Sequence, residues 1–441
     1  MALIEESFED TLLITRHADD ALLGVLDAGQ LRLPVVRTTR HHPADVRLTR
    51  AAIRAELGLD CVVLDCLRVK VSADDVVRRL LRVEALPPIP ERADVRWTHH
   101  NDLARSTTTE PSPPAGERPW AQPGWWTRCS AWIGRAMQTA GLGQPRRIEQ
   151  IRAWEFSGVL RIEADQGTYY CKLLPPAYAA EPALVQQLAQ WQPARVPDVV
   201  AVDAEARWLL LRACDGQSLE DGAPLPDWER AACAYAELQL TSSQHLPTLR
   251  ALGCRDRDLL TLRSLIGPLL DDDAALRLDA EHGLAEDELS RLRTLAPRLE
   301  AACAELAASG LPTALEHGDL WASNVYVGPH DVAVIDWTDA SLAHPFLSLS
   351  PLLQSARWAT ELSRTPDAEQ RIVDAYLEPW SARASLAQLR HLLALARPLA
   401  AVHIATTYWR DIPQPHHQWW MPRCVPFFLR LALAEWDAAH A

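Results

Sequence analysis

The spacing of apolar residues predicts a helix and a set of short strands after residue 124. Between residues 124 and 142 the apolar side chains fall on one face of a helix, and Gly141 provides a typical helix stop. The residues of that face are Trp125, Cys129, Trp132, Ile133, Ala136 and Met137. Strand-like runs follow at 148–154, 158–163, 168–174, 199–202 and 207–212, with a hairpin turn at 165–167 and a helix that starts at Pro182. The pattern predicts a β-rich lobe.

A helical periodicity replaces this pattern from Asp227 onward. One stripe and one ladder of apolar residues carry it, formed by Trp228, Ala231, Ala232, Tyr235 and Leu238 and by Leu289, Leu292, Leu295, Leu299 and Leu306. The stretch 315–340 departs from this period. Its polar residues predict a loop, and the alternation at 325–327 and 332–335 predicts a short hairpin that ends at Asp336. We expect a mainly helical lobe that contains this loop and hairpin.

The first hundred residues predict a separate small α/β domain. Apolar runs lie at 11–14, 22–26, 33–37 and 61–69, and a helical pattern covers 45–57. The segment 106–123 is rich in proline and lacks apolar periodicity, which is typical of a linker. We therefore expect four regions, which are a domain over 1–105, the linker, a β-rich lobe over 124–215 and a helical lobe over 216–441.

Charge and composition exclude several classes of protein. The chain of 441 residues carries 58 acidic and 44 basic side chains, a net charge of −14, which argues against nucleic-acid binding. Charged residues and prolines interrupt every apolar stretch before it could span a membrane. The acidic N-terminus differs from a secretory signal, so we expect a cytoplasmic protein. Nine scattered cysteines without a CxxC pair favour reduced thiols over a zinc site.

Lysine is rare in this chain, because Lys70 and Lys172 are the only lysines among the 44 basic residues. A lysine offers a compact ammonium where the broad guanidinium of arginine does not fit. Lys172 lies on the third predicted strand of the β-rich lobe and is therefore a candidate for a position that requires a point charge. The alternative is an edge-strand charge that stays in solvent.

Polar side chains gather around the predicted loop and hairpin. His317, Asp319 and Asn324 lie on the loop, and Asp336 ends the following strand, so three side chains with oxygen atoms come together. An amide oxygen and carboxylates so arranged suit a hard cation such as Mg²⁺, which takes few protein ligands and leaves room for phosphate oxygens. The alternative is a turn with a capping aspartate and an unrelated strand end. The order and spacing of the two motifs favour the functional interpretation.

The motif HGDLWASN, followed by IDW, resembles the signature of the aminoglycoside phosphotransferase and choline kinase family. Members of this family are related to protein kinases but phosphorylate small molecules. The resemblance covers about residue 125 to the C-terminus. It implies an α+β, protein-kinase-like fold with an antiparallel-sheet N-lobe and a mainly helical C-lobe. It also implies that Asp319 acts on the acceptor hydroxyl, while Asn324 and Asp336 bind Mg²⁺. His317 is expected to brace the loop.

The same resemblance assigns the nucleotide to the β-rich lobe. Lys172 corresponds to the lysine that contacts the phosphates, and Glu181, which opens the next helix, corresponds to its carboxylate partner. Ser157 and Gly158 lie in the phosphate-covering turn, and the adenine is expected near 211–214. Two positions depart from the family pattern. The turn holds a single glycine, and a serine, Ser348, is found where the family commonly has an acidic residue.

These observations predict a phosphotransferase that moves the γ-phosphoryl group of ATP or GTP, with Mg²⁺, to a hydroxyl of a small-molecule acceptor. An alternative is a kinase-like module that binds nucleotide without catalysis and regulates a partner. A third possibility is hydrolysis of nucleoside diphosphates by residues 1–105. The helix AAIRAELGL at 51–59 faintly resembles the helix of a Nudix hydrolase, but only Glu56 of its acidic residues remains, so we interpret this domain as non-catalytic. The aromatic cluster at 406–422 suits a ring-bearing acceptor and equally suits helix packing.

Overall fold

The computed structural model forms two compact units. It describes residues 6–16, 19, 21–27, 29–71, 76–98, 118–278, 280–412 and 420–440. The first unit contains the described residues up to 179 together with 200–213, and the second contains 180–199, 214–412 and 420–440. Most of the predicted linker, residues 106–117, lies outside the described residues, as does the stretch 413–419 of the aromatic cluster.

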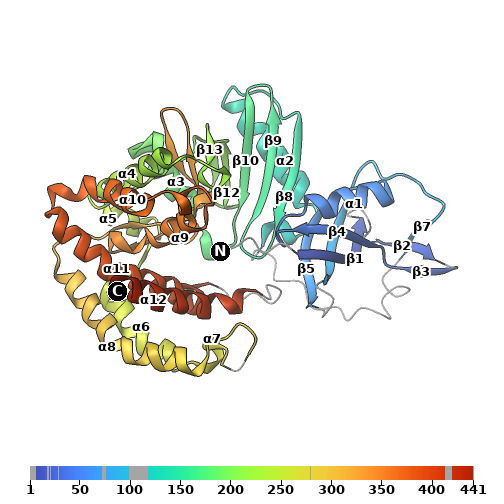
Figure 1. The fold of residues 1–441 in the computed structure, drawn as a ribbon. Coiled ribbons are helices and arrows are strands. Elements are labelled where there is room, and N and C mark those ends of the chain that lie inside the picture. Colours follow the sequence, from blue (N-terminus) through green and yellow to red (C-terminus); the bar gives the residue numbers. More distant parts are fainter. Residues whose placement is uncertain are drawn as a thin grey trace. The chain divides into compact units, whose positions relative to one another are not determined.

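A seven-stranded sheet forms most of the N-terminal part of the first unit (Figure 1). Its strands are β1 (Glu6–Arg16), β2 (Ala21–Asp27), β3 (Gln30–Arg32), β4 (Val35–His41), β5 (Asp60–Val71), β6 (Val76–Leu86) and β7 (Val95–Thr98). The order is β3-β2-β1-β6-β5, with β4 on β1 and β7 on β2. The pairing of β1 with β6 is parallel, and the other pairings are antiparallel. This region is therefore mainly β-structure, with less helix than the predicted α/β domain.

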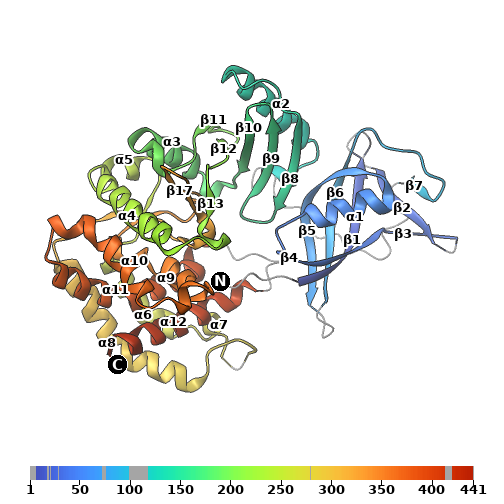
Figure 2. The ribbon, with the colours of Figure 1, turned by 45° about the horizontal axis from the view of Figure 1, so that its top comes forward.

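One helix, α1 (Arg47–Leu57), packs on this sheet (Figure 2). Ile53 and Leu57 point into a core that includes Leu12 and Val83 from the strands. The helix ends at Gly58, which adopts φ 69°, a left-handed conformation that glycine accepts without steric cost. The helix matches the predicted one, and its proposed likeness to a Nudix helix stays a prediction.

A buried ion pair joins strand β1 to strand β6. Arg79 donates from Nε to Oδ1 of Asp10 at 2.7 Å and from Nη2 to Oδ2 at 2.9 Å, and both side chains are at most 4% exposed. Thr49 of α1 donates to the same carboxylate at 2.9 Å, and Arg79 also donates to the carbonyl of Pro43. The sequence predicts no strand at β6, because the arginines of this strand interrupt the alternation of apolar and polar residues. Arg79 nevertheless faces the interior, since Asp10 neutralises its charge.

We predict that Asp10→Ala destabilises the first unit by about 3–5 kcal/mol, because Arg79 would remain buried without its counter-charge. Chemical denaturation monitored by circular dichroism measures the effect. The matched control is Glu9→Ala on the same strand, which breaks pairs with the exposed Arg37 and Arg78 and should cost less than about 1 kcal/mol. Equal losses for the two variants would contradict the prediction.

The second sheet of the first unit has five strands in the order β11-β12-β10-β9-β8, and the pairings of β12 with β10, β10 with β9 and β9 with β8 are antiparallel. They are β8 (Arg147–Ala153), β9 (Gly158–Ala164), β10 (Gly167–Leu173), β11 (Val199–Asp203) and β12 (Trp208–Arg212). Helix α2 (Trp125–Thr139) packs on it through Cys129, Ile133 and Met137, each fully buried. The predicted helix and all five predicted strands of the β-rich lobe are confirmed to within two residues at each end.

A buried glutamine connects the two sheets of the first unit. Gln150 on β8 accepts the Val63 N–H at its Oε1 and donates from Nε2 to the Val63 carbonyl, both at 2.8 Å. Its side chain thus satisfies both backbone groups of an irregular point in β5, where the register shifts between Val63 and Asp65. Arg50 of α1 also donates to the carbonyl of Gln150.

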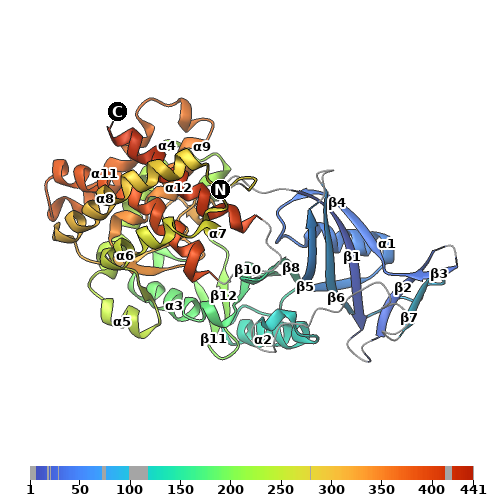
Figure 3. The same ribbon diagram turned by 90° about the horizontal axis from the view of Figure 1, so that it is seen from below.

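The second unit is mainly helical (Figure 3). Its α-helices are α3 (Glu181–Trp191), α4 (Leu225–Ser242), α5 (Leu246–Ala251), α6 (Leu259–Leu270), α7 (Asp273–Leu276), α8 (Glu286–Ala308), α9 (Ser350–Trp358), α10 (Ala368–Leu377), α11 (Leu386–Thr406) and α12 (Cys424–His440). Helix α12 packs along α11, and α6 packs against α8. Two small three-stranded sheets contain β13 (Gln217–Ser218), β14 (Arg255–Asp256), β15 (Ala314–Glu316), β16 (Val325–Val327), β17 (Val332–Val334) and β18 (Ser341–Ala343).

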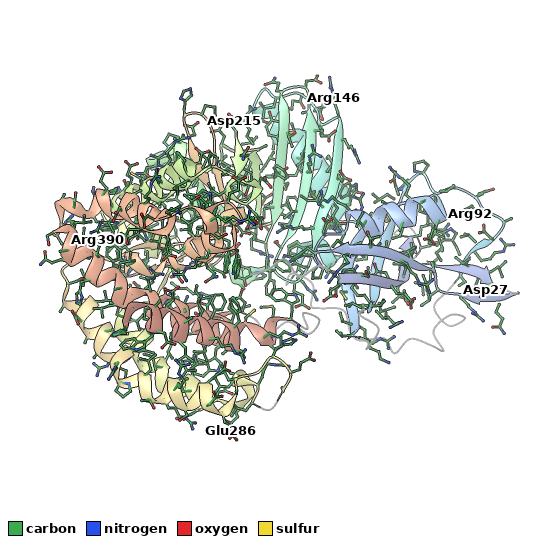
Figure 4. All side chains as sticks on the ribbon, viewed as in Figure 1. Asp27, Arg92, Arg146, Asp215, Glu286 and Arg390 are labelled. Carbon is green, nitrogen blue, oxygen red and sulfur yellow. The ribbon has the colours of Figure 1, made fainter. Side chains whose placement is uncertain are left out.

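Charged residues lie on exposed positions of these helices, such as Glu286 at the start of α8 and Arg390 on α11 (Figure 4). None of the helices among the described residues is both long and apolar enough to cross a membrane.

Candidate active site

The motif HGD forms a tight turn directly after strand β15. Gly318 adopts φ 82°, and a Cβ atom at this position would lie 2.6 Å from the carbonyl oxygen of Asp339. Both the backbone conformation and the close approach require glycine. The turn is thereby held against the segment that follows the IDW motif, so the two motifs identified in the sequence meet in space.

Side chains accept each of the three backbone N–H groups of this turn. Tyr235 Oη accepts from His317 at 3.1 Å, Glu316 Oε1 accepts from Gly318 at 2.7 Å, and His317 Nδ1 accepts from Asp319 at 3.2 Å. Since Nδ1 is the acceptor, we assign the ring proton of His317 to Nε2, which lies 3.0 Å from the carbonyl oxygen of Ile335. The buried imidazole therefore braces the turn against the strand before Asp336, as expected from the sequence.

Asn324 lies beside Asp319 and is connected to the second strand of the hairpin. Its Nδ2 donates to the carbonyl of Asp319 at 2.8 Å and to the Asp319 carboxylate at 3.2 Å. Its own carbonyl accepts the Ile335 N–H at 2.9 Å, and Val325 pairs with Val334 in the antiparallel β16–β17 ladder. The amide orientation leaves the Oδ1 atom of Asn324 available as a neutral oxygen ligand.

Asp336 follows this hairpin in an unusual backbone conformation. Its φ is 64°, in the left-handed region that non-glycine residues seldom adopt. Its Oδ1 accepts a hydrogen bond from Thr338 Oγ1. Strain of this kind costs about 1–3 kcal/mol and persists where the surroundings hold it in place, which is typical of functional sites.

Glu181 supplies part of that support. Its carboxylate is 3% exposed and accepts from the Trp337 N–H at 3.0 Å and from Thr338 Oγ1 at 3.1 Å. The single hydroxyl proton of Thr338 is therefore shared between Glu181 and Asp336. The pairing of Glu181 with Lys172 stays a prediction, whereas its hydrogen bonds place Glu181 next to Asp336.

The surroundings of Asp319 raise the pKa of its carboxyl group. Burial, and then repulsion from the Asp336 carboxylate, raise the pKa of Asp319 to about 6. Hydrogen bonds from Asn324 and from the Trp321 indole act in the opposite direction. A carboxylate with this pKa can accept a proton near neutral pH more readily than an ordinary aspartate.

The oxygen atoms of Asn324 and Asp336 fit a small divalent cation. They offer one neutral and one anionic hard ligand, from the residue just before β16 and from the second residue after β17. Among the described residues no group of three or more His, Cys, Asp or Glu side chains could hold a metal ion by itself. A two-ligand arrangement suits Mg²⁺, which usually keeps several waters and binds phosphate oxygens of its substrate.

Lys172, Ser157 and Gly158 belong to the first unit. Lys172 lies in the middle of the sheet on β10, opposite Val159 and Leu209. Gly158 begins β9, and its position packs closely on the indole of Trp120. Ser157 Oγ accepts the Trp154 indole N–H at 3.0 Å, so this side chain helps to close the turn.

Ser348, one of the two departures noted in the sequence, accepts hydrogen bonds from two side chains. Tyr235 Oη donates to Ser348 Oγ at 2.9 Å, and Gln239 Nε2 donates to the same oxygen at 3.2 Å. Tyr235 is the residue that accepts the His317 N–H. The departure at Ser348 is therefore accommodated in the hydrogen-bond network that supports the HGD turn.

Sequence analysis missed Glu316, a buried carboxylate at the end of β15. Its Oε2 accepts from Ser341 Oγ at 3.0 Å and lies 3.4 Å from His403 Nε2. Burial by itself raises the pKa of Glu316, but His403, Arg257 and the Gly318 N–H together hold it below the ordinary value. A glutamate at the end of an apolar strand was the available signal, although its partners Ser341 and His403 are remote in sequence.

We predict that Glu316→Gln lowers the melting temperature at pH 7 and that the difference from wild type shrinks as the pH falls. The folded-state pKa of Glu316 is depressed, so its ionised form stabilises the fold above the ordinary pKa of 4.5. That contribution is lost as the pH drops through the folded-state value. Calorimetry between pH 7 and pH 3 measures it, and a difference that grows toward low pH would contradict the assignment.

Comparison with known proteins identifies the family to which this chain is similar. The model of the phosphotransferase enzyme family, APH, matches residues 147–389. No curated protein matches the sequence. Similar solved structures include a choline/ethanolamine kinase family protein from Mesorhizobium loti, with 16% identity over 71% of this chain and 93% of that chain and a TM-score of 0.45. Another is choline kinase LicA from Streptococcus pneumoniae, with 11% identity over 70% and 99% and a TM-score of 0.47.

A third similar structure is the GDP complex of a mutant aminoglycoside 2'-phosphotransferase, with 15% identity over 70% of this chain and 98% of that chain and a TM-score of 0.48. The antiparallel-sheet lobe and the mainly helical lobe predicted from the sequence are confirmed. Because the family model spans more than half of the 441 residues, the protein belongs to the phosphotransferase enzyme family.

Proposed function

We propose that this protein transfers the γ-phosphoryl group of ATP or GTP to a hydroxyl of a small-molecule acceptor, with Mg²⁺. The observation that carries the proposal is the hydrogen bond from Asn324 to Asp319, which sets a carboxylate and a free amide oxygen side by side. The HGD turn and the hairpin before Asp336 hold both residues in place. Phosphoryl transfer needs positioning and charge neutralisation more than covalent chemistry from the protein. The rigidly bonded turn supports positioning, and a bound Mg²⁺ would supply the neutralisation.

Asp319 acts on the acceptor. Its carboxylate accepts the hydrogen bond of the hydroxyl and orients the oxygen in line with the γ-phosphorus. The oxygen–phosphorus bond forms as the bond from the γ-phosphorus to the β–γ bridging oxygen breaks, so the nucleoside diphosphate leaves. The hydroxyl proton passes to Asp319, whose raised pKa of about 6 suits that role.

Asn324 and Asp336 would hold Mg²⁺. The bound ion neutralises the charge of the phosphate oxygens. The hydrogen bonds of Glu181 to Trp337 and Thr338 support the strained backbone on either side of the Asp336 carboxylate. Lys172 would contact the nucleotide phosphates, with Glu181 as its carboxylate partner and the turn at Ser157 and Gly158 over the phosphates.

We predict that Asp319→Ala lowers turnover at least about a thousandfold, because the hydroxyl loses both its orienting group and its proton acceptor. Stabilisation of the protein by Mg·ATP or Mg·GTP in a thermal-shift assay should persist, since Asp319 is not a nucleotide contact. Nucleoside diphosphate release across a panel of hydroxylated metabolites measures turnover. Nucleotide-induced stabilisation of the wild type without any product would favour a non-catalytic nucleotide-binding module instead.

We predict that Asp336→Asn raises the Mg²⁺ concentration needed for half-maximal activity by at least about tenfold, since a neutral ligand replaces an anionic one. Titration of Mg²⁺ at saturating nucleotide measures this change. The matched control is Asp331→Asn, an exposed aspartate in the turn of the same hairpin, which should leave the Mg²⁺ dependence unaltered. Equal responses of the two variants would remove Asp336 from metal binding.

A further inference from the structure

Trp321 extends an aromatic surface directly from the catalytic turn. Its backbone N–H donates to the carbonyl of Asp319 at 2.8 Å, which fixes the start of the side chain beside the carboxylate. Its indole also interacts with that carboxylate and lowers the pKa of Asp319. A molecule that presents a hydroxyl to Asp319 therefore meets the Trp321 ring.

A second indole continues this surface outward. The rings of Trp321 and Trp358 are stacked, with centroids 5.6 Å apart and planes 6° from parallel. Trp358 is the last residue of α9, and this helix is attached to the catalytic loop by the hydrogen bond from the Ala322 N–H to Ser355 Oγ at 3.2 Å. Phe427 of α12 lies 6.5 Å from the Trp358 ring. The stack is thus in contact with the catalytic loop, α9 and α12.

Trp358 remains accessible despite these contacts. Its exposed fraction is 45%. Among the described residues, the other large hydrophobic side chains that are exposed are aliphatic. A rigid indole that is oriented by stacking but left open to solvent loses little conformational entropy when a ligand covers it. Such a surface is typical of a binding site.

The charged groups next to Trp358 neutralise one another. Arg357 donates to Glu369 at 2.7 and 3.0 Å and also bonds Glu435, and Arg397 bonds the same two carboxylates. Two cations and two anions form this network. It provides no net negative charge to attract an ammonium group to the stack, whereas an uncharged ring with an apolar face fits it.

We propose that the Trp321–Trp358 stack is the acceptor subsite and that the acceptor is an uncharged cyclic alcohol, with its ring against the indoles and its hydroxyl at Asp319. This inference rests on the proposed function. It names the class of acceptor and gives Trp358 the role of a specificity-determining residue.

The test compares acceptors and variants in the full-length protein. The cyclic probes are methyl glucopyranoside, methyl galactopyranoside and myo-inositol, and the comparison compounds are sorbitol, an acyclic alcohol, and choline, a cation. Release of nucleoside diphosphate gives kcat and KM, and saturation-transfer NMR with Mg²⁺ and a non-hydrolysable nucleotide reports binding without turnover. The variants are Trp358→Ala, Trp358→Phe and, as matched control, Trp436→Ala, which removes an indole that stacks on His440 at the far end of α12.

We expect at least one cyclic probe to have a KM about tenfold or more below that of sorbitol. Trp358→Ala should raise this KM about tenfold with a smaller effect on kcat, and Trp358→Phe should recover part of the loss. Trp436→Ala should behave as wild type. A preference for choline or sorbitol, or an unchanged KM and saturation transfer in Trp358→Ala, would overturn the inference.

Failure of the proposed function would look different. In that case neither nucleotide stabilises the wild type in the presence of Mg²⁺, and no acceptor of any class yields product. If Mg·nucleotide binds while no cyclic probe reacts or shows saturation transfer, the proposed nucleotide site survives and the acceptor assignment is wrong.

Discussion

The close approach of Gly318 to Asp339 is the constraint on which the site depends. It forces the chain into a left-handed turn immediately before Asp319 and presses that turn against the residues that follow Asp336. A backbone so tightly folded cannot satisfy its own N–H groups. Tyr235, Glu316 and His317 accept them instead, and each of these side chains also contacts another element. The turn is therefore tied by hydrogen bonds to the elements that surround it.

The same contacts couple the two motifs. His317 bonds the carbonyl of Ile335, and Asn324 bonds both Asp319 and the N–H of Ile335. A displacement of either motif would break bonds to the other. Preorganisation of this kind matters for phosphoryl transfer, because the rate depends on in-line positioning and on charges fixed before the reaction. The strained backbone at Asp336 is tolerated because Glu181 and Thr338 hold the residues around it.

The aromatic surface beside the catalytic turn is built on the same scaffold. Trp321 belongs to the motif itself, while Trp358 is brought to it by α9, whose Ser355 bonds the loop. Catalytic and acceptor-binding groups would therefore share one rigid frame. The seven-stranded N-terminal sheet is stabilised separately, by the buried pair of Asp10 and Arg79 and by the link from Gln150 to Val63.

The sequence by itself determined the strands of the β-rich lobe, several of the helices and the identity of the motif residues. Amphipathic periods fixed α2, α4 and α8, and alternation fixed the hairpin before Asp336, because these patterns depend on neighbours within a few positions along the chain. Only the tertiary structure decided that Arg79 faces the interior, that Glu316 is buried under the catalytic turn and that Trp358 stacks on Trp321. Each of these residues depends on a partner far along the chain. The amino-acid sequence around such a residue gives no sign of which distant group will neutralise its charge or stack on its side chain.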